Sequence, residues 1–398
     1  MALTPNWRWF GPGDPVTLKE IRQTGAAGIV SALHHVPAGM TWPDAEIRKH
    51  REFIRTEGFE WRVVESLSVH EDIKKRSGQF RQYVDHYKTS IRNLARFGID
   101  TIIYNFMPVL DWLRTDLRVV AQDGAITTKF ESMAVAAFDL FILNRPKAAA
   151  DYASSQIDEA RLYFSRLSEG QKDQLTGTVL LGLPGSLEAY TLDEFRNALA
   201  AYNDIDDEIL MGNLFAFLDE VIPVAESAGV YMAIHPDDPP RSLFGLPRIV
   251  NNISNIDRIL NHRPSPYHGL ALCTGSLGAS LRNDPVEMAG RFAGRIQFSH
   301  LRNMERDEKG DFRETYPLDG DMDLFAVIEI LLSEQQRRLA AGLPNTRMPF
   351  RPDHGPLMIP EFNKKGIYPG YSLLGRMRAL AELRGMEAAV RRRCGRGG

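Results

Sequence analysis

Short apolar runs that end in polar residues recur along the first part of the chain, and segments with the charge pattern of amphipathic helices separate them. The apolar runs cover residues 25–33, 61–66 and 100–106, and the helical pattern covers residues 44–57 and 79–97. Strands that alternate with helices in this way are typical of parallel βα units, in which each helix returns the chain to the start of the next strand.

The same alternation returns in the second half of the chain. Four apolar runs end there at His235, Cys273, His300 and Asp353. The helices expected around them cover residues 213–228, 252–262, 285–292, 323–341 and 375–393. Residues 302–319 are polar and are expected to form a long loop.

Residues 108–209 interrupt this alternation. They contain a hairpin signal around Asp123 and Gly124 and are otherwise mostly helical in pattern. One further strand is needed to make eight, and both 138–143 and 178–183 are candidates for it. The aromatic residues 7–10 are expected to dock the N-terminus onto the body of the protein.

These elements predict an α/β fold, a (β/α)8 TIM barrel with a mostly helical insertion after the third strand. We expect a single domain over residues 1–398, with 108–209 as an insertion that acts as a lid or as an oligomer contact.

The composition narrows the class of protein. The hydrophobic content of 43% and the charged content of 25% are those of a globular protein. The net charge of −3 provides no general basic field for nucleic acid or an anionic membrane. The chain has only two cysteines, and no apolar run approaches a membrane span or a signal peptide. A cytoplasmic protein with no nucleic-acid partner and no membrane partner is expected.

The four polar strand ends suggest a metal site. In a barrel of this kind the carboxyl ends of the strands meet on one face, so His235, Cys273, His300 and Asp353 would lie close together at the ends of strands five to eight. Two imidazoles, a thiolate and a carboxylate bind divalent transition metals, with zinc, Fe²⁺ and Mn²⁺ all compatible. Each residue alone has a commoner explanation as a core or turn residue, and only their shared position in the alternation favours a metal site.

Further polar residues are expected on the same face. Arg302, two residues after His300, can grip a carboxylate with two hydrogen bonds or form a loop ion pair. Strand alternation would direct only one of His34 and His35 inwards. The remaining candidates are Arg8, Glu65, His70, Asn105, Asp237, Asp319 and Tyr371.

A family resemblance runs through nearly the whole chain. The segments that carry it are WRWFGP (7–12), SALHH (31–35), VES (64–66), HEDIK (70–74), YNFMPVLDW (104–112), GLPG (182–185), HPDDPPR (235–241), GLPRIV (245–250), CTGS (273–276), HLR (300–302) and RPDHG (351–355). In these segments the sequence resembles the mannonate dehydratases, which belong with the xylose-isomerase-like TIM barrels.

The resemblance implies dehydration of D-mannonate to 2-dehydro-3-deoxy-D-gluconate in the breakdown of hexuronates such as glucuronate. It implies one Mn²⁺ or Fe²⁺ per chain, and the ligands of the family match His235, Cys273, His300 and Asp353. The catalytic tyrosine of the family corresponds to Tyr371, with Tyr368 nearby. A sugar-acid substrate and a homo-oligomer, a dimer or larger, are expected.

The dehydration chemistry assigns provisional roles. The proton at C2 of the sugar acid must be removed and the hydroxyl at C3 protonated. Tyr371, His35 and the surroundings of Asp353 are candidates for these transfers. Arg302 would hold the substrate, with further contacts from Arg8, His34, Asn105, Asp237 and Asp319.

Three alternatives are less favoured. A sugar isomerase on the same barrel would prefer carboxylate ligands over Cys273, and a metal-dependent nuclease would need a basic stripe. A sugar-acid-binding protein without activity would be expected to have lost at least one of the four ligands.

Overall fold

Eight parallel strands close into a barrel in this computed structural model, which describes residues 2–181 and 190–394. In order around the barrel they are β1 (Thr4–Arg8), β12 (Pro349–Arg351), β9 (Ile296–His300), β8 (His268–Cys273), β7 (Tyr231–Ile234), β4 (Thr101–Tyr104), β3 (Glu60–Glu65) and β2 (Gly28–Ser31). The predicted TIM-barrel fold is confirmed.

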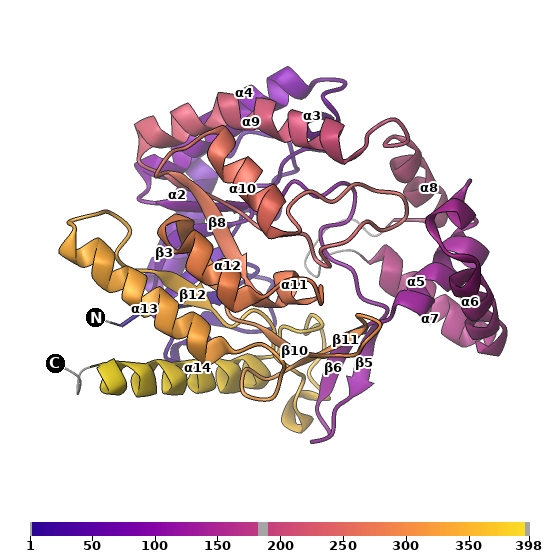
Figure 1. Ribbon diagram of the computed structural model, residues 1–398. Coiled ribbons are helices and arrows are strands. Elements are labelled where there is room, and N and C mark those ends of the chain that lie inside the picture. The colour runs from indigo at the N-terminus through magenta and orange to yellow at the C-terminus, as the bar shows by residue number, and fades with distance from the viewer. Residues whose placement is uncertain (1, 182–189, 395–398) are drawn as a thin grey trace.

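Helices surround this barrel, and the helices expected from the sequence are present (Figure 1). They are α1 (Leu18–Arg22), α2 (Asp44–Thr56), α3 (Glu71–Lys75), α4 (Phe80–Arg96), α9 (Asp207–Ala228), α10 (Ile253–His262), α11 (Thr274–Gly278), α12 (Pro285–Phe292), α13 (Leu324–Ala340) and α14 (Leu373–Cys394), with the short turns η3 (Ala293–Arg295) and η4 (Ile359–Glu361). Their apolar faces pack on the outside of the strands and form the main core. A second, smaller core fills the barrel interior and includes Val63, Ile103 and Phe298.

The N-terminal aromatic segment is a barrel strand and not only a docked end. Trp7 pairs with Ile29 of β2, and Thr4 pairs with Pro349 of β12, so β1 closes the barrel. The fourth strand expected within 108–209 is therefore not needed. Residues 138–143 form the π-helix η1 (Phe138–Leu143), residues 178–180 end helix α7, and residues 182 and 183 lie outside the described residues, as does the GLPG segment.

The insertion consequently follows the fourth barrel strand and not the third. It contains β5 (Asp116–Val120), β6 (Ile126–Phe130), α5 (Ser132–Ala137), η1, η2 (Ala148–Asp151), α6 (Ser154–Arg166), α7 (Glu169–Leu180) and α8 (Leu192–Ala200). Helices α5 to α8 gather to one side of the barrel strands in Figure 1. The hairpin predicted around Asp123 and Gly124 is confirmed as β5 and β6.

The polar segment expected to be a loop forms a second hairpin, β10 (Asn303–Arg306) and β11 (Phe312–Thr315). Strand β11 pairs with β6 of the insertion, which gives a four-stranded antiparallel sheet in the order β10-β11-β6-β5. We call this the accessory sheet. It joins two segments that are far apart in the sequence, and this distant pairing explains why the local pattern did not predict it.

Strand register places the polar strand ends level with one another. Cys273 at the end of β8 pairs with His300 of β9, and His300 pairs with Arg351 of β12. The carboxyl ends of these strands therefore present their polar side chains at one end of the barrel. Across residues 2–181 and 190–394, no helix combines the length and the apolar character that a membrane span requires.

Candidate metal centre and active site

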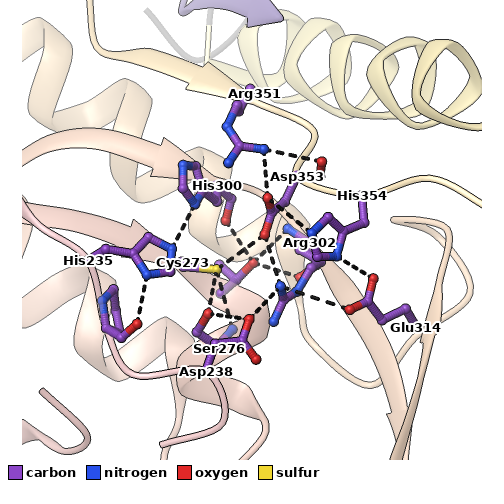
Figure 2. Close-up of polar contacts among 12 residues, drawn as sticks. His235, Asp238, Cys273, Ser276, His300, Arg302, Glu314, Arg351, Asp353 and His354 are labelled. Carbon is purple, nitrogen blue, oxygen red and sulfur yellow. Dashed lines mark hydrogen bonds and ion pairs between the residues drawn. The ribbon is translucent and has the colours of Figure 1, made fainter. Parts of the chain in front are cut away.

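Three metal-capable side chains meet at the carboxyl end of the barrel. His235 follows β7 directly, Cys273 ends β8 and His300 ends β9. One donor atom from each of the three lies within 4.8 Å of the others. Cys273 and His300 are fully buried, whereas His235 is partly exposed. Figure 2 shows the three side chains converging from neighbouring strands.

The contacts of the two imidazoles fix how they face. His235 Nδ1 lies 2.7 Å from the backbone oxygen of Pro236 and donates its hydrogen there. His235 Nε2 therefore carries the lone pair, and it lies 3.0 Å from His300 Nδ1. His300 Nε2 lies 3.4 Å from a carboxylate oxygen of Glu65. A carboxylate on the far nitrogen is the usual way in which a metal-binding imidazole is oriented.

The thiol of Cys273 lies in a polar setting. Ser276 donates to the sulfur through its hydroxyl at 3.0 Å and its backbone N–H at 3.3 Å, because Cys273 caps helix α11. The carboxylate of Asp353 lies 3.7 Å from the same sulfur.

Asp353 lies beside these three side chains, and two arginines bind its carboxylate. Its Oδ1 accepts from Arg351 at 2.6 Å and its Oδ2 accepts from Arg302 at 3.0 Å. Burial raises the pKa of Asp353, but His354 and Arg351 outweigh burial and keep that pKa well below its usual range. Asp353 is therefore an ionised carboxylate adjacent to the three donor atoms.

On the opposite side of the site, Glu65 forms ion pairs with two arginines. Its carboxylate binds Arg8 at 2.7 Å and Arg351 at 2.7 and 3.0 Å. Burial raises the pKa of Glu65, but Arg351 and Arg8 more than offset burial and hold the pKa well below its usual range.

A second buried network extends from Arg302 to the accessory sheet. Arg302 Nη1 donates to Asp238 at 2.8 Å, and Asp238 also accepts from Arg114 at 3.0 Å. Arg114 continues to Glu314 of β11, and Glu314 binds Nδ1 of His354 at 2.6 Å. Burial raises the pKa of Glu314, but His354 and Arg114 reverse this and lower it to about 2.

These two networks surround a cavity at the barrel end. Predicted site residues that line it are Arg8, Glu65, Asn105, His235, Arg302, Asp353 and Tyr371. Burial raises the pKa of Tyr371 to about 12, against the opposing effect of Arg351. The phenol is therefore protonated near neutral pH. Its ring contacts those of Phe10 and His354 edge-on, with centroid distances of 4.8 and 5.1 Å.

Several predicted residues are not among those that line this cavity. Two of them, Cys273 and His300, belong with His235 to the metal-capable group, and the others lie elsewhere. His34 and His35 line a second cavity, and Nε2 of His35 lies within hydrogen-bond distance of Glu46, at 3.0 Å, in an exposed contact. Asp237 is buried and accepts from the backbone N–H of Val250 at 2.8 Å, so it orders the loop after β7. Asp319 pairs with Arg378 at the surface.

Several residues of the site were not nominated from the sequence. They are Arg114, Asp238, Glu314, Arg351 and His354, whereas Glu65 was expected on this face. Strand alternation could have found Arg351, because it lies two residues before Asp353 and so points to the same side of the chain. Nothing in the local pattern marks Glu314, because it lies in the hairpin that was expected to be a loop.

The donor set fits a divalent transition metal. Two imidazole nitrogens and a sulfur lie within mutual reach of a single ion, and an ionised carboxylate lies next to them. Nitrogen and sulfur ligands of this kind suit the later first-row metals, and the carboxylate widens the range towards manganese and iron.

Sequence comparisons agree with this chemistry. The family model for D-mannonate dehydratase (UxuA) matches residues 2–396. A mannonate dehydratase of Chromohalobacter salexigens is 49% identical over 386 residues, which cover 97% of this chain and 98% of that protein. A mannonate dehydratase of Saccharophagus degradans is 48% identical over 388 residues, with 98% of each chain covered.

Structural comparisons extend the likeness. The crystal structure of a mannonate dehydratase from Streptococcus suis serotype 2 matches with a TM-score of 0.77 and 32% identity, covering 99% of this chain and 95% of that one. A D-allulose 3-epimerase from Methylomonas sp. matches with a TM-score of 0.51 and 9% identity, over 97% of this chain and 98% of that one, and shares the fold alone. On the strength of the family match and of these identities across almost its full length, the chain belongs to the D-mannonate dehydratase family of carbon–oxygen lyases.

Proposed function

We propose that this protein removes water from D-mannonate and yields 2-dehydro-3-deoxy-D-gluconate. The observation that carries the proposal is a cavity lined by Arg302, the protonated phenol of Tyr371 and His235, which also belongs to the group of three metal-capable side chains, within the family's fold. Dehydration of a sugar acid needs these elements: a site for the carboxylate, a group that takes the C2 proton and a group that protonates the C3 hydroxyl.

The proposed metal ligands are His235, Cys273 and His300, with Asp353 as the fourth. A divalent metal bound there, Mn²⁺ or Fe²⁺, would supply Lewis acidity to substrate oxygens. The carboxylate of Asp353 is ionised and already next to the cysteine sulfur, which supports its inclusion.

Arg302 is the proposed anchor for the substrate carboxylate. Its Nη1 pairs with the carboxylates of Asp238 and Asp353, whereas its Nη2 has no hydrogen-bond acceptor in the described part of the chain. A buried guanidinium N–H without a partner costs free energy, and a carboxylate in the cavity would satisfy it. Arg8 and Asn105 also line the cavity and are proposed to bind the sugar acid.

Tyr371 and His354 are the proposed proton-transfer pair. His354 takes the proton from C2 on Nε2, because its Nδ1 is engaged by Glu314. The C2–H electron pair becomes the new C2=C3 bond as the C3–O bond breaks. Tyr371 gives its proton to the departing hydroxyl, which leaves as water, and the enol product then tautomerises to the 2-keto acid. The cycle closes when the proton on His354 passes back to Tyr371, whose ring the imidazole contacts edge-on.

Some predicted residues have no place in this reaction. His35 and Asp319 pair with Glu46 and Arg378 outside the cavity, His34 lines the second cavity, and Asp237 is engaged with the backbone.

We also propose that residues 1–398 form one domain and that the insertion at 108–209 serves site closure or assembly into a homo-oligomer. The reaction fits a role in the breakdown of hexuronates.

The test is a direct assay. The protein is incubated with D-mannonate and Mn²⁺ under reducing conditions, and formation of a 2-keto-3-deoxy acid is followed. The proposal expects one keto acid and one water per substrate consumed. Recovery of an isomeric sugar acid, or of unchanged D-mannonate at every metal tested, would overturn it.

A further inference from the structure

The accessory sheet contacts the active site through the carboxylate of Glu314 in β11, which binds His354. In β11 the buried residues alternate with partly exposed ones, so Phe312 and Glu314 lie on the inner face. The backbone at Glu314 is fixed from the insertion side, because the hydroxyl of Thr127 in β6 donates to its carbonyl oxygen at 2.9 Å. The side chain of Glu314 is 3% exposed.

The two oxygens of Glu314 have different partners. Oε2 lies 2.6 Å from Nδ1 of His354, and Oε1 accepts from Arg114, with Nε at 3.0 Å and Nη2 in a shorter contact. Arg114 is itself fully buried and lies over the rings of Trp112 and Phe312. The carboxylate is thus clamped from one side and presents its second oxygen to the imidazole, as Figure 2 shows for Glu314 and His354.

This contact decides which nitrogen of His354 faces the chemistry. A carboxylate that accepts the Nδ1 hydrogen holds an imidazole in one tautomer and one orientation. Nε2, on the other side of the ring, then faces away from Glu314, and it lies 3.7 Å from Oδ1 of Asp353 at the cavity. The rings of Trp112 and Tyr371 contact His354 edge-on at 6.2 and 5.1 Å, so the imidazole has little freedom to turn.

We propose that Glu314 is a positioning residue that holds the imidazole of His354 with Nε2 on the cavity side, and that the accessory sheet exists in part to place this carboxylate. This inference rests on the proposed role of His354 in the dehydration. It gives the hairpin β10–β11 and its pairing with the insertion a direct link to turnover.

The test compares Glu314→Gln with Glu314→Asp and with a matched control, Glu305→Gln. Glu305 lies on β10 of the same sheet and is paired with Arg313 at the surface. Each variant is loaded with Mn²⁺, and kcat, KM, bound metal and Tm are measured. We expect kcat of Glu314→Gln to fall by at least about tenfold with KM and bound metal unchanged, because the carboxylate acts through a proton-transfer group. Glu305→Gln should retain the wild-type kcat.

A double variant separates positioning from a structural role. In a His354→Asn background, Glu314→Gln should cause no further loss of kcat, because its effect passes through the imidazole. An equal loss in both backgrounds, or a wild-type kcat for Glu314→Gln, would overturn the inference. If Glu314→Gln does not fold, Glu314→Asp is compared in both backgrounds, since it keeps the charge for Arg114 and only withdraws the oxygen from His354. A wild-type kcat for His354→Asn alone would instead overturn the proposed proton-transfer role.

Discussion

Replacement of Arg302 by lysine separates the structural and substrate-binding tasks of this side chain. Lysine keeps a charge for Asp238 and Asp353 but offers no planar second donor. Both carboxylates also keep another arginine, Arg114 for Asp238 at 3.0 Å and Arg351 for Asp353 at 2.6 Å. We therefore expect the free energy of unfolding to change by only about 1 kcal/mol, well short of the roughly 3–5 kcal/mol lost when a buried charge is left unpaired.

The effect on turnover should be larger. The proposed hydrogen bond from Arg302 Nη2 to the substrate carboxylate is charge-assisted, and bonds of this kind are worth about 1.5–3 kcal/mol. Its loss corresponds to a fall in kcat/KM of about 10- to 150-fold, at about 1.4 kcal/mol per factor of ten. Steady-state kinetics with D-mannonate and urea unfolding measure the two quantities. The control is Arg313→Lys, on a surface ion pair with Glu305. A kcat/KM within about threefold of wild type, where a bond of at least about 1.5 kcal/mol was expected, would refute the assigned role.

Three further predictions concern separate parts of the molecule. A Cβ added at Gly275 would lie 2.0 Å from Nε of Arg302, so Gly275→Ala should displace the guanidinium and raise KM for D-mannonate, and an unchanged KM would contradict this packing. Tyr371→Phe should lower kcat by about 10²–10⁴-fold while Tm stays near wild type, and full turnover would exclude Tyr371 as the acid. Burial, with help from Arg295, lowers the pKa of His268 from 6.5 to about 3. The unfolded chain therefore binds a proton first as pH falls, and this residue should cost about 1.4 kcal/mol of stability per pH unit below pH 6.5. Urea unfolding at pH 7 and pH 5 should show a weaker pH dependence in His268→Gln, and an identical dependence would contradict it.

The barrel could be predicted because its signal is local and repeated. Each apolar run is a buried strand of the barrel, and each charged amphipathic segment is a helix on the outer surface of the barrel. Strand β1 escaped the same reasoning because it is short and contains Pro5 and Asn6. Its identity as a strand depends on its pairing with β12, at the other end of the chain. Because the count of barrel strands began at β2, it came to seven, and the eighth was wrongly sought within residues 108–209.

The metal-capable residues were found for a physical reason as well. His235, Cys273 and His300 all occupy the position where a parallel strand ends, and barrel geometry brings such positions together. Arg302 and Tyr371 also reach the cavity, whereas His35 and Asp319 do not line it, because a polar residue near a strand end can equally turn outwards.

The residues that surround the site were harder to foresee. Arg114 and Glu314 come from the insertion and from a hairpin, and their meeting depends on the pairing of β6 with β11. That pairing joins segments far apart in the chain, and the hydrophobic periodicity of the sequence does not reveal it. Ion-pair networks of this kind are specified by tertiary structure alone. A sequence pattern can therefore predict the metal-capable residues more readily than the ion-paired residues that surround them.

The most direct test of the account is a titration of turnover against metal. Protein freed of metal by a chelator is mixed with D-mannonate and increasing Mn²⁺, and keto-acid formation is recorded for wild type, His235→Ala and Cys273→Ser. The account predicts no turnover without metal, saturation at about one equivalent per chain in wild type, and loss of bound metal and turnover in both variants. Full turnover in the chelated protein, or a full equivalent of bound metal in His235→Ala, would contradict it.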